Sequence, residues 1–418
     1  MYYFSKVIKK SIASLPILVL SMGAAYAQTS KGPPLQAYPS MEPDQELKSG
    51  EMSRVGPPSS WRPTFRLPGT ETDLRIGGYI KADFIYDFDK DLGAVTNPFL
   101  ADVTPRETDG KFNAHALETR FNIGTSTPTK YGRLNTFFGS HMLGRPGRGE
   151  EELLSIRHAY AELGSLLAGR TWSNVMSFIA SPRIVKLGSP TGGVFTRPAQ
   201  IRYSMKFTQD HQLSFSLEDH DAIISNASGN PTPRDDVSVA TNSSAPALTA
   251  RYEFGRRFAL AGMVRELDVE SSGIDDSAFS WGVYGHYAQP LWSSAVLKSA
   301  LWVGEGNGSY MSPSPTDGYV KDGKIKPIEH ASGYVALEQN WSPRFTSTLA
   351  YSRVQRSGVP DSLAAIERRR VDTIWADIFF NLTPRVNFGL GYAYARSERF
   401  DGRNGNANRI NAMMMTQF

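Results

Sequence analysis

Basic side chains recur along this sequence at positions where they could bind anions. Each lies in a segment that alternates between apolar and polar residues, on the side opposite the apolar ones: Lys81, Arg120, Arg170, Arg202, Arg251 and Lys298. Because strand side chains point alternately to the two faces of a sheet, these cations are expected to share one face. A guanidinium can hold a carboxylate through two parallel hydrogen bonds, whereas a lysine ammonium acts as a point charge. The spacing therefore predicts a surface that attracts small anionic solutes.

Carboxylates on the same face leave a second role open for these cations. They are fewer than the basic residues: Asp83, Asp87, Glu118, Glu218, Glu253, Glu338 and Asp377. At least half of the cations are expected to pair with acids on neighbouring strands and to hold the wall together. The excess of basic residues is what would act on a solute.

No residue pattern indicates catalysis or a bound cofactor. The sequence has no cysteine, no Gly-x-Ser-x-Gly and no His-Glu-x-x-His, so thiolate chemistry and cysteine-ligated metal sites are excluded. The glycine-rich stretch 304–308 follows a strand-like segment with no helix behind it and fails as a nucleotide-binding loop. Four scattered histidines are interpreted as residues of the inner surface or its rim: His115, His141, His158 and His286. We therefore predict no catalytic residue, no metal site and no cofactor.

The chain begins with a predicted export signal, residues 1–27. Three lysines precede an apolar run, and Ala25-Tyr26-Ala27 offers small residues for cleavage. Pro16 interrupts the run, which argues against a membrane anchor of about 20 residues. Residues 28–72 are rich in proline, serine and charge, which predicts a periplasmic linker. The formal net charge is +4, of which the signal lysines carry three, so the remainder gives no reason to expect nucleic acid.

From Asp73 to Phe418 apolar and polar residues alternate as they do in membrane strands. The alternating segments have lengths that suit the about 9–11 residues needed for one crossing of the membrane. We expect about sixteen strands, at 73–88, 112–126, 131–142, 154–163, 166–172, 196–207, 211–219, 246–255, 257–268, 278–290, 293–304, 329–341, 344–356, 368–382, 386–398 and 408–418. The fold class is therefore all-β, a transmembrane antiparallel barrel.

The connections between these segments alternate between short and long. The long ones are 89–111, 143–153, 173–195, 220–245, 269–277, 305–328, 357–367 and 399–407. Short periplasmic turns and long extracellular loops are typical of bacterial outer-membrane barrels. We therefore expect the chain in the outer membrane of a Gram-negative bacterium, surrounded by lipid.

The third long loop is unusually apolar for an exposed segment and carries Arg183 and Lys186. Its apolar residues are Phe178, Ile179, Ile184, Val185 and Leu187. Such residues are better explained if the loop folds inward and packs on the inner wall. At the other end, the last strand finishes on Phe418, which resembles the signal read by the outer-membrane assembly machinery.

Three segments resemble the DcaP-like porin family. They are Leu74-Arg75-Ile76-Gly77-Gly78-Tyr79-Ile80-Lys81, the stretch from Arg157-His158-Ala159-Tyr160 to Arg170-Thr171-Trp172-Ser173, and Arg197-Pro198-Ala199-Gln200-Ile201-Arg202-Tyr203. The resemblance implies a sixteen-stranded channel, a homotrimer and a preference for small anions such as dicarboxylates. The proline-broken residues 28–72 depart from the coiled-coil extension expected before such a barrel.

The sequence thus predicts a porin for passive diffusion of small hydrophilic solutes and not an enzyme. An outer-membrane enzyme or a surface adhesin with a closed lumen remains the alternative. Sixteen strands favour the porin because barrels of that size leave a channel. The residues expected to line the channel are Lys81, Arg120, Arg170, Arg202, Arg183, Lys186, Arg251 and Lys298.

Overall fold

The computed structural model describes residues 65–102, 108–143, 154–227, 244–255, 257–271, 274–292 and 294–418. The expected export signal and linker residues 28–64 lie outside this part of the chain. Within it, none of the helices has the length and apolar character needed to cross a membrane.

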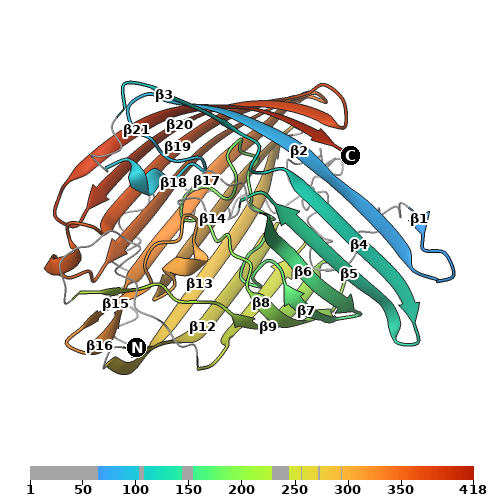
Figure 1. Ribbon diagram of the computed structural model, residues 1–418, viewed down its shortest axis with the longest axis horizontal. Coiled ribbons are helices and arrows are strands. Elements are labelled where there is room, and N and C mark those ends of the chain that lie inside the picture. Colours follow the sequence, from blue (N-terminus) through green and yellow to red (C-terminus); the bar gives the residue numbers. More distant parts are fainter. Residues whose placement is uncertain are drawn as a thin grey trace. The chain divides into compact units, whose positions relative to one another are not determined.

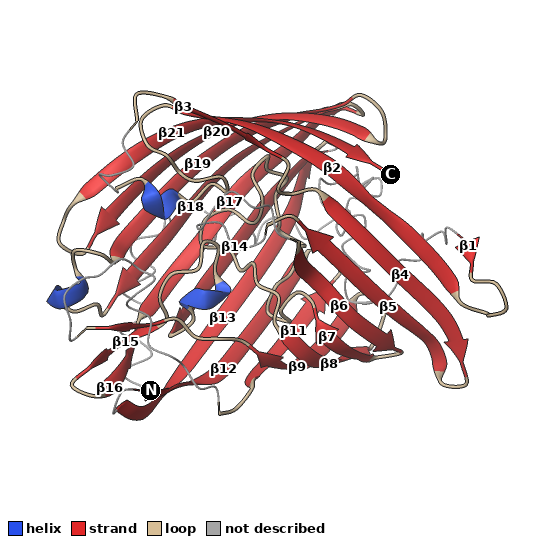
Figure 2. Ribbon diagram, in the orientation of Figure 1, coloured by secondary structure: helices blue, strands red, loops and turns tan. Residues whose placement is uncertain are grey.

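The described strands form an antiparallel sheet that closes into a barrel (Figures 1 and 2). Its strands in chain order are β1 (Phe65–Arg66), β2 (Asp73–Asp87), β3 (Lys111–His115), β4 (Arg120–Thr129), β5 (Gly132–His141), β6 (Ser155–Leu163), β7 (Leu166–Arg170), β8 (Ala199–Lys206), β9 (His211–Asp219), β11 (Ala247–Phe254), β12 (Phe258–Ser271), β13 (Ile274–Trp292), β14 (Ala295–Glu305), β17 (Glu329–Ser342), β18 (Phe345–Ser357), β19 (Arg368–Asn381), β20 (Val386–Arg399) and β21 (Asn404–Gln417). Of these 18 strands, the two-residue β1 only forms a short hairpin with the start of β2, and β3 and β4 pair with successive parts of β2 as one strand. The described wall therefore has the sixteen strands expected, each overlapping its predicted segment.

The barrel closes where β2 pairs with β21, from Tyr79 opposite Gln417 to Asp87 opposite Arg409. The Arg409 guanidinium donates from Nε and Nη2 to the two carboxylate oxygens of Asp87, each at 2.6 Å. Such a bidentate pair is among the stronger hydrogen-bonded arrangements. The terminal Phe418 amide continues the seam by donating to the Gly78 carbonyl at 3.1 Å.

The two faces of the wall differ as the alternation predicts. On β19 the outward side chains Ile374, Ile378 and Phe380 are exposed, while the inward Trp375 and Asp377 are buried. An apolar outer band and a polar inner face are what a barrel in lipid requires, because a charge facing lipid at mid-depth costs about 2–4 kcal/mol for arginine or lysine.

Short turns and long loops alternate as expected, with three differences. The hairpin of β12 and β13 extends to Ser271 and Ile274, so most of the loop expected at 269–277 is strand. Two other loops contribute a small sheet of β10 (Ile224–Asn226), β15 (Gly318–Lys321) and β16 (Lys324–Pro327). The loops also hold the 3₁₀ turns η3 (Pro98–Leu100), η5 (Gly308–Tyr310) and η6 (Asp361–Leu363).

The small sheet packs on the inner face of the long hairpin. Ile224, Val320 and Ile325 form one buried cluster with Leu267 and Val269 of β12.

The third difference concerns the end of the expected linker, where β1 pairs with the start of β2 and the Leu67 amide donates to the Thr72 carbonyl. The barrel therefore includes residues 65–72 as a short hairpin.

Candidate functional site

The loop between β7 and β8, residues 171–198, lies along the inside of the barrel as the sequence predicts. Ile179 packs against Ala259, Ala288 and Val296 of the wall. Further along the loop, Ile184 joins a cluster with Trp375, and Val185 joins one with Tyr79 and Phe379. These contacts come from strands far apart around the barrel, so the loop follows a large part of the inner wall.

Four wall carboxylates accept hydrogen bonds from this loop, one after another along its course. Glu218 accepts from the Ser173 hydroxyl at 2.7 Å and from the Asn174 amide at 2.6 Å, and Glu253 accepts from the Ser177 hydroxyl at 3.0 Å. Glu338 accepts from the Arg183 amide at 3.1 Å, and Asp377 accepts from the Val185 amide at 3.0 Å. Hydrogen bonds to a charged acceptor are about twice as strong as neutral ones. The wall acids therefore anchor the loop at spaced points.

Four of the predicted basic residues bind the same loop through its carbonyl groups. Lys81 donates to the Val185 carbonyl at 3.0 Å and Lys298 to the Ser181 carbonyl at 2.9 Å. Arg202 donates to the carbonyl of Trp172, and Arg251 to that of Met176. We call the four carboxylates and these four cations the loop clamp. The structure thus gives these cations a contact that the sequence did not reveal.

The Val185 backbone is held from both sides, because its N–H donates to Asp377 on β19 and its carbonyl accepts from Lys81 on β2. Lys81 also lies 2.8 Å from Glu118 and 3.2 Å from Asp83. Next to this peptide is a narrow crevice of about 30 Å³, lined by Lys81, Arg183 and Lys186 among others. That volume is about enough for one water molecule. Three of the predicted residues therefore line one crevice.

The two loop cations differ in their surroundings. The Arg183 guanidinium lies 4.1 Å from the centre of the Phe379 ring and donates to Asn381 at 3.1 Å. The Lys186 ammonium lies 5.2 Å from the centre of the Trp375 ring. Burial lowers the pKa of Arg183 to about 10 and that of Lys186 to about 8, although Glu118 and Asp377 oppose the shift at Lys186. Lys186 therefore loses its charge as the pH rises through about 8.

A second basic group lies on the wall formed by β4 to β6 and on the returning end of the loop. Arg120 stands opposite His141, with its guanidinium 5.1 Å from the Tyr79 ring centre. Arg157 and Arg197 lie over the Trp172 ring, at 5.8 Å and 4.3 Å from its centre. His158 lies 5.5 Å from the same ring. We call Arg120, Arg157 and Arg197 the arginine cluster.

Sequence reasoning missed Arg157 and Arg197 as pore candidates. Both lie in the segments that carry the family resemblance, but neither was placed by alternation. Arg157 falls where the register between β5 and β6 shifts, next to Gly139 and Ser140. Arg197 lies in the loop, outside any strand. Only the presence of the aromatic Trp172 among the segments that carry the family resemblance could have pointed to these two arginines.

The prediction that Arg170 faces the lumen is wrong. This residue ends β7 and is exposed, in the same phase as the exposed Leu166. Its ladder partner on β8 is Ala199, which shares the outward face with the exposed Ile201. The strand begins with two leucines in succession, so its sequence fits either phase equally well.

The family model described as DcaP outer membrane protein matches residues 64–418. The chain belongs to the DcaP outer membrane protein family. A search of curated proteins finds no match.

Solved structures share the fold of this DcaP family member. The outer membrane channel DcaP of Acinetobacter baumannii superposes with a TM-score of 0.75 at 23% identity, covering 85% of this chain and 100% of that one. An anion-selective porin from Comamonas acidovorans gives 0.52 at 10% identity, covering 83% and 100%. OmpF of Salmonella typhi gives 0.51 at 11%, covering 85% and 100%. The DcaP family member is thus an outer-membrane porin of Gram-negative bacteria, a channel and not an enzyme.

Proposed function

We propose that this DcaP-family porin prefers small anions, dicarboxylates in particular, and that the arginine cluster provides the preference. The observation that carries the proposal is the gathering of Arg120, Arg157 and Arg197 over two aromatic rings, Tyr79 and Trp172. A guanidinium over a ring keeps its N–H groups in the guanidinium plane, where they can meet a carboxylate side by side.

The inward loop adds a second group of cations to this arrangement. It brings Arg183 and Lys186 to the crevice that Lys81 also lines. A dicarboxylate has two charges and can contact one group of cations before it leaves the other. Arg120, Arg183 and Lys186 are themselves buried, so only a small part of each cation meets a passing solute and binding at each stays weak. Passage through a channel needs such weak, successive sites.

We assign the loop clamp a different part in this function. Lys81, Arg202, Arg251 and Lys298 bond loop carbonyls, so they fix how far the loop projects into the barrel. They would set the width of the channel, while the arginine cluster would set its charge preference. The shared fold of the anion-selective Comamonas porin supports a barrel of this kind discriminating by charge.

Replacing Arg120 and Arg197 together by glutamine tests the proposal. A unit charge about 7 Å from a solute in a water-like medium contributes about 0.6 kcal/mol, which attracts anions and repels cations by about threefold each. Salt screens part of this, with a Debye length of about 10 Å at 0.1 M. The anion-to-cation permeability ratio, from the zero-current potential in a salt gradient, should fall at least fivefold.

The matched control removes two outward arginines, Arg170→Gln with Arg396→Gln, and should leave the potential unchanged. Heat-modifiable migration in detergent gels shows that both variants are folded. An unaltered potential in the folded Arg120 and Arg197 variant would mean that the arginine cluster does not act on passing ions.

We further infer that the porin is a homotrimer, as a structure of Vibrio cholerae OmpT in its trimer form illustrates for this fold. Closed symmetric oligomers are the default for such assemblies. Native mass in mild detergent tests this, and a monomer alone would contradict it.

A further inference from the structure

The outer face of β18, β19 and β20 changes character toward the end with the long loops. Below that end it is an apolar band of exposed side chains: Leu349, Ile374, Ile378, Phe380, Phe388 and Leu390. Tyr351 and Tyr394 follow in the same outward phase. Tyrosines favour the boundary between hydrocarbon and head groups. The band therefore ends at the tyrosines.

Arginines occupy the outward positions immediately beyond these tyrosines. Arg353, Asp372 and Arg396 stand side by side on the three strands, in direct register. Asp372 lies between two guanidinium groups, 2.6 Å from Arg353 Nε and 2.5 Å from Arg370 Nε. The Tyr351 hydroxyl donates to the same carboxylate at 2.5 Å. We call Arg353, Arg370 and Arg396 the outer arginine patch.

The outer arginine patch carries more positive charge than its protein partners balance. Two of its three cations, Arg353 and Arg370, share Asp372, while the nearby Glu398 pairs with Arg369. Arg396 is exposed and has neither an ion pair nor a side-chain hydrogen bond among the residues that the structure describes. A basic side chain this far from the bilayer centre costs only about 0–1 kcal/mol, so the patch is tolerated at head-group level.

We propose that the outer arginine patch binds the phosphate groups of a phosphorylated lipid in the outer leaflet. With the long loops outside the cell, the patch lies at the level of that leaflet's head groups. Guanidinium groups suit phosphate because they can bond two of its oxygens at once. A spaced pair such as Arg370 and Arg396 fits a lipid with two phosphates, as in the lipid A portion of lipopolysaccharide.

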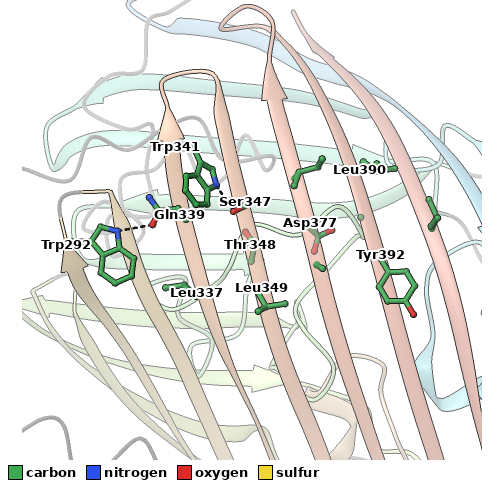
Figure 3. Close-up of a pocket in the computed structure, with 14 residues that line it drawn as sticks. Trp292, Leu337, Gln339, Trp341, Ser347, Thr348, Leu349, Asp377, Leu390 and Tyr392 are labelled. Carbon is green, nitrogen blue, oxygen red and sulfur yellow. Dashed lines mark hydrogen bonds between the residues drawn. The ribbon is translucent and has the colours of Figure 1, made fainter.

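An apolar groove further down the same face fits the chains of such a lipid (Figure 3). It has a volume of about 480 Å³, and Leu349, Leu390 and Tyr392 are among the residues that line it. At its far end the indole N–H groups of Trp292 and Trp341 are satisfied by Gln339 and Ser347, both at 2.9 Å, so the rings present apolar surface.

The separation of patch and groove matches one leaflet. Leu349 lies four residues from Arg353 along β18, and Leu390 lies six residues from Arg396 along β20. At about 3.3 Å per residue this is about 13–20 Å along the strands. The hydrocarbon core is about 30 Å thick, so a single leaflet accounts for about half of it. An acyl chain that starts at the patch therefore ends in the groove.

The test measures binding of bis-phosphorylated lipid A to the purified, folded full-length porin by native mass spectrometry in detergent. Arg370→Gln with Arg396→Gln should weaken binding at least fivefold and leave the Arg353 and Asp372 pair in place. Arg396→Gln alone, at an exposed side chain, should weaken it by about twofold to threefold. Lipid A without its phosphates should bind the unaltered porin as weakly as it binds the double variant.

The control is Arg344→Gln with Arg385→Gln, which removes two exposed arginines from the short turns at the opposite end. It should change binding by less than twofold. Equal weakening in both double variants, or equal binding of lipid A with and without phosphates, would overturn the proposal. So would a change in oligomer mass with unaltered lipid binding, because the face would then be a contact between copies of this chain.

Discussion

Replacing Glu218 by glutamine should release the first segment of the inward loop. The buried Glu218 carboxylate accepts from the Ser173 hydroxyl at 2.7 Å and from the Asn174 amide at 2.6 Å. Glutamine keeps the shape of the side chain but has no charge, and one of its two ends donates and does not accept.

The magnitude follows from these two bonds. A hydrogen bond to a charged group contributes about 1.5–3 kcal/mol, against about 0.5–1.5 kcal/mol for a neutral one. Weakening both bonds costs about 2–3 kcal/mol in total. Since about 1.4 kcal/mol is a factor of ten, the equilibrium constant for local detachment should rise about 30-fold to 150-fold.

Amide hydrogen exchange measures that constant directly, because local opening controls exchange of protected amides. Exchange of residues 173–176 should accelerate by the same factor, while β9 and the seam of β2 with β21 keep their protection. The control is Glu266→Gln, an exposed carboxylate on the outward side of β12. Unchanged exchange at Asn174, or a uniform acceleration along the barrel, would refute the loop clamp as the reason for the loop's position.

Two further predictions concern the tip of the inward loop. Gly391→Ala should lower the single-channel conductance. The added Cβ would lie 2.2 Å from an Asp377 oxygen and 3.1 Å from Val185, which would push the loop toward the lumen at a cost of about 1–3 kcal/mol. The control is Gly285→Ala, whose added Cβ has no atom within 4 Å, and equal conductance in both variants would contradict the reasoning. The anion preference should decline between pH 7 and 9, because burial lowers the pKa of Lys186 to about 8 and a lysine loses its charge as the pH rises through its pKa. The Lys186→Arg variant should keep the anion preference across this range. A flat pH profile in the unaltered porin would count against the assignment.

The wall of the barrel could be predicted because each strand carries its own signal. Alternation in Leu74 to Phe88 is visible without knowledge of any partner, and lipid on one side enforces it at every crossing. Where the signal is ambiguous the prediction fails, as at Arg170, whose strand opens with Leu166 and Leu167. A single-residue shift in phase moves every side chain to the other face.

The small sheet could not be predicted because its strands lie outside the membrane. Ile224 pairs in parallel with Gly318, a residue of another loop, and no lipid enforces alternation there. Short polar stretches such as Lys321 to Lys324 resemble any turn. Pairing between distant loops depends on the folded barrel bringing them together.

The loop clamp lies between these cases. Alternation placed Lys298 and Glu338 on the inner face, and they do pair at 2.9 Å. That Lys298 also bonds the Ser181 carbonyl follows from the path of the loop, and a backbone carbonyl has no signature in the sequence. The apolar Ile184 and Val185 indicated that the loop turns inward, but not which strands it would contact.

The seam between β2 and β21 constrains when the barrel can form. Residues 79–87 find their partners only at 409–417, near the end of the chain. Until those residues arrive, β2 and β20 each present an unpaired edge, and such edges invite association with other chains. Pairings of such large sequence separation are also slow, because loop-closure entropy is lost before the contacts form. The buried pair of Arg409 and Asp87 is among the last contacts available, so closure joins the two ends of the barrel and satisfies both charges in a single step.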